Sequence, residues 1–266
     1  MFSRLVGGVA LCLALVLLCE PGAAEWYVGG YGGFSSPSDL SSVTMPDFGQ
    51  RSALSDPLLA PATNPELASL TQTFKTADIK TESSPIFGGK VGYFFNQQQL
   101  PWLGVELEVF TTKPDIEAQV VQTNQDIQFN PVNIAPGGVC SFYPTSTPTC
   151  PQLIHKDGSL QVPSSSLRVF TAAANVLVRY PGGWYEPYVG VGVGAFYFRG
   201  TGAIAGDQVV PGLNGLWGIK LFPTDEWGFF VEGKYNRATI SSFDSTFGIS
   251  ATYDAFHVVG GVLYRF

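Results

Sequence analysis

The sequence predicts an all-β protein: an eight-stranded antiparallel, up-and-down transmembrane β-barrel with two long extracellular loops. Three observations lead to this fold class. Eight segments alternate between apolar and polar or small residues with a period of two, which is typical of strands. Only 13% of the 266 residues are charged, about half the share usual in soluble domains. No apolar run after the N-terminal segment is long enough for a spanning helix, so a membrane protein of this composition crosses as a barrel.

The first 24 residues have the features of a signal peptide. Arg4 supplies a positive charge, Leu5–Cys19 forms an apolar core, and a run of small residues ends at Ala24. We expect cleavage after Ala24, which leaves residues 25–266 as a single barrel domain. Two alternatives stay open: cleavage before Cys19 to give a lipoprotein, and retention of the segment as a membrane anchor.

The eight expected strands are about Glu25–Phe34, Pro85–Phe95, Trp102–Thr112, Leu167–Tyr180, Tyr185–Arg199, Val209–Phe222, Trp227–Ile240 and Asp254–Phe266. The last strand ends on an aromatic residue. A strand that pairs with the first one and closes a barrel does not fray as a free terminus does. Short turns follow the even-numbered strands and longer connections follow the odd-numbered ones. This asymmetry is typical of bacterial outer-membrane barrels.

Two long polar segments, about residues 35–83 and 113–165, are predicted to be extracellular loops. The first contains several prolines and little regular period, apart from a short helix expected near Pro65–Lys75. The second contains Cys140 and Cys150, separated by residues rich in Pro, Ser and Thr. Two nearby cysteines in an exported chain favour one local disulfide, which would mainly shape a loop.

Alternation gives each strand one apolar face and one polar or glycine-rich face. Eight strands enclose an interior only wide enough for side chains, so the bulky aromatic and aliphatic residues fit outside more easily than inside. The polar and glycine-rich faces then line the lumen. In the closing strand we expect these residues to meet lipid: Phe256, Val258, Val262, Tyr264 and Phe266.

The inward faces contain a nearly balanced set of charges. They are Glu106, Glu108, Glu186 and Glu232, together with Lys90, Arg179, Lys220, Lys234 and Arg265. Charges in a narrow lumen must pair, because an unpaired one costs several kcal/mol. We therefore predict an ionic network that fills the lumen.

The groups that could carry chemistry do not favour catalysis. Glu106 and Glu108 lie about 7 Å apart on one strand face; they suit acid–base work, but a salt-bridge network explains them as well. His257 faces inward and is read either as a proton relay or as a satisfied interior residue. The sequence has no nucleophile elbow, phosphate-binding loop or zinc-ligand spacing, so we expect no enzyme activity, no metal and no cofactor. A net charge of −7 argues against nucleic acid as a partner.

In these features the chain resembles the outer-membrane β-barrel family of the OmpA/OmpX type, a porin-like class of Gram-negative bacteria. The resemblance rests on the signal peptide, on WYVGGYGGF at the start, on the GGKVGYFF and YVGVGVGAFY strands, and on the final GGVLYRF. It implies an outer-membrane location and recognition of Tyr264 and Phe266 by the barrel-assembly machinery. It also implies contact with outer-membrane lipids and lipopolysaccharide, to which divalent cations could bridge the acidic rim. Family members include structural barrels, adhesins, small-solute channels and lipid-modifying enzymes.

We expect a non-enzymatic role in structure or surface recognition, with the long loops meeting an extracellular ligand. A narrow channel for ions or small polar solutes stays open as an alternative, and so does a lipid-modifying enzyme. Lipid A deacylases of similar size carry a histidine and a serine two residues apart. Here the residue two positions after His257 is Val259, which argues against that activity. A soluble lipocalin-like barrel is the structural alternative.

Overall fold

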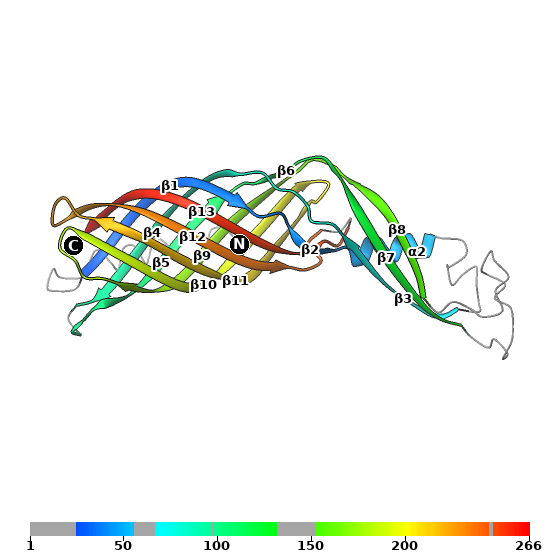
Figure 1. Ribbon diagram of the computed structural model, residues 1–266, viewed down its shortest axis with the longest axis horizontal. Coiled ribbons are helices and arrows are strands. Elements are labelled where there is room, and N and C mark those ends of the chain that lie inside the picture. The colour runs from blue at the N-terminus through cyan, green and yellow to red at the C-terminus, as the bar shows by residue number, and fades with distance from the viewer. Residues whose placement is uncertain (1–24, 56–66, 97, 132–152, 245–246) are drawn as a thin grey trace.

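The computed structural model describes residues 25–55, 67–96, 98–131, 153–244 and 247–266. Eight antiparallel strands close into a barrel at one end of an elongated molecule, and a β-sheet arm with a helix projects from the other end (Figure 1). The predicted fold class is therefore confirmed. The predicted signal peptide and the proposed disulfide between Cys140 and Cys150 lie outside the described residues.

The barrel strands follow one another around the wall in chain order. They are β1 (Glu25–Pro37), β4 (Ser84–Phe95), β5 (Leu100–Thr112), β9 (Ser165–Arg179), β10 (Tyr185–Gly202), β11 (Gly206–Leu221), β12 (Trp227–Ile240) and β13 (Ser250–Arg265). Strand β1 pairs with β13 from Tyr27 opposite Arg265 onward, which closes the barrel. Trp26 and Phe266 also exchange backbone hydrogen bonds, at 3.0 and 3.3 Å, so the terminal aromatic is held in the wall.

The two segments predicted as loops contain further strands and a helix. These elements are β2 (Ser41–Thr44), α2 (Pro46–Ser55), β3 (Leu67–Thr76), β6 (Asp115–Ile116), β7 (Gln119–Pro131) and β8 (Leu153–Val162). Strand β2 pairs with β13, and β3, β7 and β8 follow it in that order, while β6 pairs with β9. The barrel wall and the arm therefore form one continuous sheet of 13 strands.

The helix expected near Pro65–Lys75 is wrong, because β3 occupies Leu67–Thr76 and pairs with β7. The β-branched residues Thr71 and Thr73 favour an extended backbone. Pairing with β7 also satisfies the backbone N–H and C=O groups, which a lone short helix would leave to solvent at its ends.

The helix of the arm is α2, which packs on one face of this sheet. Phe48 of the helix meets Phe74 of β3 edge to face, with ring centroids 5.3 Å apart. The side-chain amide of Gln125 on β7 donates to the carbonyl oxygen of Gly49 at 3.0 Å. Among the described residues, no helix is both long and apolar enough to cross a membrane.

The short connections from β4 to β5, from β9 to β10 and from β11 to β12 lie at the end of the barrel away from the arm (Figure 1). The connection expected after Arg199 is shorter than predicted. Strands β10 and β11 stay paired as far as Gly200 opposite Gly206, so residues 200–206 form the tip of a hairpin. Strands β1, β5, β10 and β12 thus lead to the arm end, and β4, β9, β11 and β13 return to the end with the short turns.

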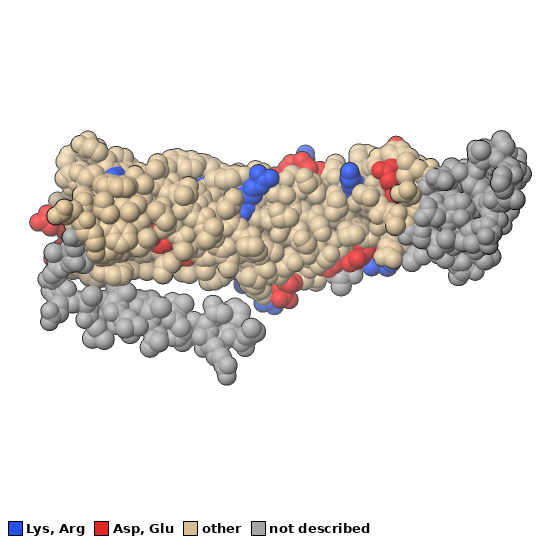
Figure 2. Space-filling model, turned by 90° about the horizontal axis from the view of Figure 1, so that it is seen from below, with Lys and Arg blue, Asp and Glu red and all other residues tan. Residues whose placement is uncertain are grey.

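The inward and outward faces follow the predicted alternation. In β13, Phe256 and Val258 are 41% and 49% exposed, whereas His257 between them is 1% exposed. On the face that Figure 2 shows, the barrel surface carries few Lys, Arg, Asp and Glu residues between the end with the short turns and the level where the arm begins. An apolar exterior around a charged interior is the reverse of a soluble barrel, so this barrel spans a membrane and the lipocalin-like alternative does not hold.

Inward-facing glycines leave space for large side chains on the neighbouring strand. Gly92 lies opposite Tyr27 and Gly88 lies opposite Tyr31. A Cβ atom on Gly92 would lie 2.3 Å from the ring of Tyr27, and one on Gly88 would lie 2.5 Å from the ring of Tyr31. Each tyrosine therefore reaches across a glycine of β4 toward β5, where the hydroxyl of Tyr27 donates to Glu106 at 2.6 Å.

Candidate functional site

The half of the lumen nearer the short turns contains all nine charged side chains that the sequence analysis assigned to it. Eight are buried, and Arg265 is partly buried. The structure adds Glu25, which contacts two of the arginines. Five carboxylates then face five cations. The signal for Glu25 was present in the sequence, since Glu25 shares the strand face of Tyr27 and the predicted set had one cation too many.

Glu108 lies at the centre of the network. Lys234 forms an ion pair with its carboxylate. The hydroxyl of Tyr31 donates to it at 3.1 Å, and the amides of Asn214 and Asn175 donate at 2.7 and 3.3 Å. Four donors from four strands thus satisfy one buried carboxylate, which is what burial of a charge requires.

Glu232 links this centre to a second group of charges. Lys234 lies 3.2 Å from one of its oxygens, and Lys90 lies 2.7 Å from the other. Lys90 also lies 3.4 Å from Glu106. The hydroxyl of Tyr188 donates to Glu232 at 2.5 Å. Carboxylates and lysines therefore alternate across the lumen and connect opposite walls of the barrel.

A ring of four charges closes the end with the short turns. Arg179 pairs with Glu25 and donates to Glu186 at 2.8 Å. Arg265 lies 3.3 Å from Glu186 and 3.4 Å from Glu25. The closing strand thus directs its arginine at two carboxylates inside the barrel.

Lys220 lies between these two groups and is held differently. Its ammonium group lies 3.6 Å from the ring centroid of Tyr27, 4.7 Å from that of Phe94 and 4.8 Å from that of Tyr188. Within the described part of the chain it has no hydrogen-bond partner. Aromatic faces stabilise a desolvated cation, so the rings take the place of a carboxylate here.

A layer of amides lies above Glu108. Asn236 donates to Asn214 at 2.7 Å and receives a hydrogen bond from His257 Nε2 at 2.8 Å. The bond to Asn214 fixes the orientation of the Asn236 amide, so that its oxygen faces His257. An amide oxygen can only accept a hydrogen bond, so Nε2 of His257 carries the proton. The ring of His257 also meets Phe110 edge to face, with centroids 5.7 Å apart. These contacts favour a structural role for His257 inside the barrel, where Nε2 is hydrogen-bonded and the buried Nδ1 has no partner among the described residues.

The lumen toward the arm is filled by apolar side chains. The following residues are each at most 1% exposed: Val169, Phe196, Phe198, Ile240, Tyr253 and Ala255. They form one cluster with buried residues of β2, β3, β6, β7 and β8. The charged layers, the amide layer and this apolar plug together occupy the barrel from end to end.

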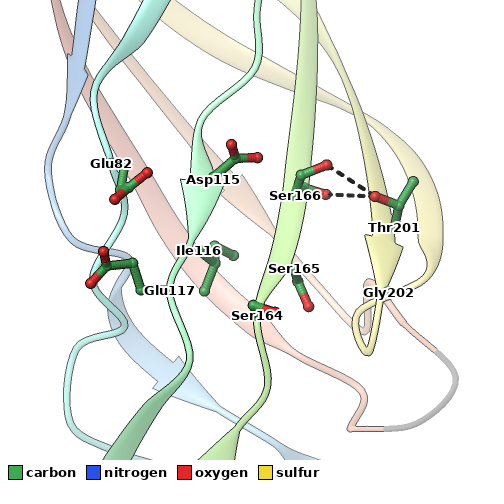
Figure 3. A pocket seen from close by; sticks show the side chains of 9 residues that line it. All are labelled: Glu82, Asp115, Ile116, Glu117, Ser164, Ser165, Ser166, Thr201 and Gly202. Atoms are coloured by element: carbon green, nitrogen blue, oxygen red, sulfur yellow. Dashed lines mark hydrogen bonds between the residues drawn. The ribbon is translucent and has the colours of Figure 1, made fainter.

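A shallow hollow of about 530 Å³ lies outside the barrel wall where the arm begins (Figure 3). Carboxylates of Glu82, Asp115 and Glu117 line one side. Hydroxyl groups of Ser166 and Thr201 line the other, 3.0 Å apart. A hydrogen bond to Glu117 and the charge of that carboxylate raise the pKa of Glu82. Sequence reasoning missed this hollow because four separate segments of the chain build it.

Among the residues that the structure describes, no group of three or more His, Cys, Asp or Glu side chains has the arrangement of a metal site. The contacts of the charged lumen point to a structural role, since each carboxylate there has a cation or hydroxyl partner.

No protein-family model matches the sequence, and a comparison with curated proteins found no match either. Among solved structures, the chain is similar to Neisserial surface protein A, with 11% identity, a TM-score of 0.47 and coverage of 91% of this chain and 97% of that one. It is also similar to OprG from Pseudomonas aeruginosa, with 16% identity, a TM-score of 0.43 and coverage of 92% of this chain and 96% of that one. A third similar structure is Ail of Yersinia pestis in complex with the heparin analogue sucrose octasulfate. Its identity is 10%, its TM-score is 0.38, and the match covers 91% of this chain and 99% of that one.

At such identities the likeness concerns the fold and transfers no activity. The even strand number, the short turns at one end and the apolar exterior of the wall decide the class. The chain is an eight-stranded outer-membrane β-barrel.

Proposed function

We propose that this barrel is a non-enzymatic membrane anchor with a closed lumen, which holds the β-sheet arm outside the cell as a recognition surface. One observation carries the proposal. From the short turns to the arm, the lumen holds the ring of four charges, the lysine–glutamate network, the amide layer and the apolar plug in succession. An open channel needs a continuous polar path. Here such a path would have to cross the apolar cluster that contains Phe196 and Phe198.

The sheet face of the arm that α2 leaves uncovered supports a recognition role. Asp126 and Asn124 of β7 lie on this face, because they alternate with Gln125, which contacts the helix. His155 of β8 lies 2.7 Å from Asp126 and 3.3 Å from Asp157. The hydrogen bond to Asp126, followed by the charge of Asp157, raises the pKa of His155. The result is an exposed but ordered set of donors and acceptors, which suits a polar extracellular ligand.

The closed lumen is tested by conductance. The purified protein is first shown to be folded by its heat-modifiable migration on a gel. It is then inserted into planar bilayers, and a large porin serves as the positive control. We expect no current steps from the protein. An Arg179→Ala variant should also be silent, because the apolar plug remains intact when the ring of charges is opened. Regular current steps from the unmodified protein would overturn the proposal and favour the channel.

The recognition role is tested on whole cells. Cells that display the protein are applied to immobilised extracellular glycans and matrix proteins. Binding should fall in an Asp126→Ala/Asp157→Ala variant that reaches the surface at normal levels. Equal binding by cells that lack the protein would remove the recognition role. Altered lipid A in the mass spectrum after overexpression would instead favour an enzyme.

A further inference from the structure

Three basic side chains form a row on the outer surface of the barrel. Arg168 of β9 lies directly opposite Arg199 of β10, and both are exposed. Lys113 directly follows β5 and lies opposite Arg168 on its other side. Strands β5 and β6 pair with β9 in the same register, and that register places position 113 opposite position 168. Asp207 of β11 lies opposite Arg199 at the end of the row. Within the described part of the chain, none of the three cations forms an ion pair.

Two arginines in directly opposed positions are unfavourable by themselves. Opposed side chains on paired strands have Cβ atoms about 5 Å apart, and like charges at that spacing destabilise a sheet. An anion placed between the guanidinium groups would remove the repulsion. Phosphate suits such a site, because a guanidinium group can donate two parallel hydrogen bonds to its oxygens.

The row lies at the level where the apolar surface of the barrel ends. The next outward-facing pair toward the short turns is Phe170 opposite Tyr197. The next pair toward the arm is Ser166 opposite Thr201, which line the hollow of Figure 3. Successive outward positions on a strand are about 7 Å apart. The surface thus passes from aromatic to cationic to hydroxyl and carboxylate groups within about 14 Å along the strands.

We propose that Lys113, Arg168 and Arg199 bind a phosphate group of an outer-leaflet glycolipid. The acyl chains lie against Phe170 and Tyr197, and the sugar to which the phosphate is attached lies toward the hollow. Hydroxyl groups of a sugar can donate to the carboxylates there and exchange hydrogen bonds with the serine and threonine. A phospholipid without a sugar would contact the aromatic pair and the three cations, and would leave the hydroxyl and carboxylate groups of the hollow without a partner.

The test uses the full barrel in phosphatidylcholine vesicles, with and without doubly phosphorylated lipid A. Native mass spectrometry measures lipid retained by the protein, and urea unfolding measures the stabilisation that the lipid gives. The test variant is Arg168→Gln/Arg199→Gln. The matched control is Arg237→Gln, an exposed arginine on the same exterior that has its own carboxylate, Asp254, at 3.7 Å.

We expect the double variant to bind lipid A about tenfold more weakly or worse, because it loses charge-assisted hydrogen bonds. The control variant should bind as the unmodified protein does. In phosphatidylcholine alone the double variant should be at least as stable as the unmodified protein, since the like-charge repulsion is gone. That measurement also shows that the variant folds.

Two further measurements identify the source of the phosphate. Lipid A stripped of its phosphates should not stabilise the unmodified protein, and inorganic phosphate in phosphatidylcholine vesicles should not replace the lipid. Equal retention of lipid A by the double variant overturns the site. So does equal binding of the phosphate-free lipid. Full stabilisation by inorganic phosphate alone overturns the assignment to a glycolipid.

Discussion

Removing one cation from the centre of the lumen should destabilise the barrel strongly. In a Lys234→Met variant, Glu108 loses its ion pair, Glu232 loses a cation at 3.2 Å, and Tyr31 loses a partner at 3.1 Å. Methionine keeps a similar volume, so little of the effect comes from a cavity. Breaking a buried pair by removing one partner costs about 3–5 kcal/mol. We expect a loss of that size in the free energy of unfolding.

The measurement is urea unfolding of the barrel in lipid vesicles, followed by tryptophan fluorescence and gel mobility. Lys220→Met is the matched control, since it makes the same substitution at a buried lysine that rests on aromatic rings. It should cost about 1 kcal/mol, in the range of a cation–π contact. Adding Glu108→Gln to Lys234→Met should recover part of the loss, because the uncompensated charge is gone. Equal losses in the two lysine variants would refute the argument from charge pairing.

Three further predictions concern packing, pH and assembly. A Gly92→Val variant should lose about 1–3 kcal/mol, because even its Cβ would lie 2.3 Å from the facing tyrosine ring; urea unfolding measures it, and an unchanged midpoint contradicts it. NMR titration should give His155 a pKa above its usual range, and Asp126→Asn should lower it. Since that pKa is raised on folding, any stability from the pair is present at acid pH and is lost as the pH rises through the folded-state pKa. Deleting Phe266 should reduce the amount of barrel in the outer-membrane fraction, and normal levels would count against its role in assembly.

The barrel was predictable because a membrane enforces alternation on every strand. Phe256 and Val258 must face lipid and His257 must not, so the local sequence alone reveals the strand and its faces. The charge composition of the lumen followed from the same rule. The partner of each lysine did not follow, because the contacts of Lys234 with Glu108 depend on how far the strands are staggered around the closed barrel.

The arm was not predictable for a different reason. Residues Leu67–Thr76 form a strand because β7 lies beside them, and β7 begins more than forty residues later in the chain. Strand preference is strongly influenced by such neighbours, and a local reading of this stretch favoured a helix. The facing pair of Arg168 and Arg199 was hidden in the same way, since only the register of β9 against β10 brings them together.

The continuity of the sheet from wall to arm has a mechanical consequence. A ligand fixed to another surface would pull on the arm along the long axis of the molecule, and the strands run at a tilt along that axis (Figure 1). The bonds between antiparallel strands lie across the strand direction. Such a force therefore loads many backbone hydrogen bonds in shear at once, instead of peeling them apart singly. Strand β2 joins β13 through two residue pairs with a register shift between them and joins β3 through one, so this junction is the weakest part of the sheet under such a load.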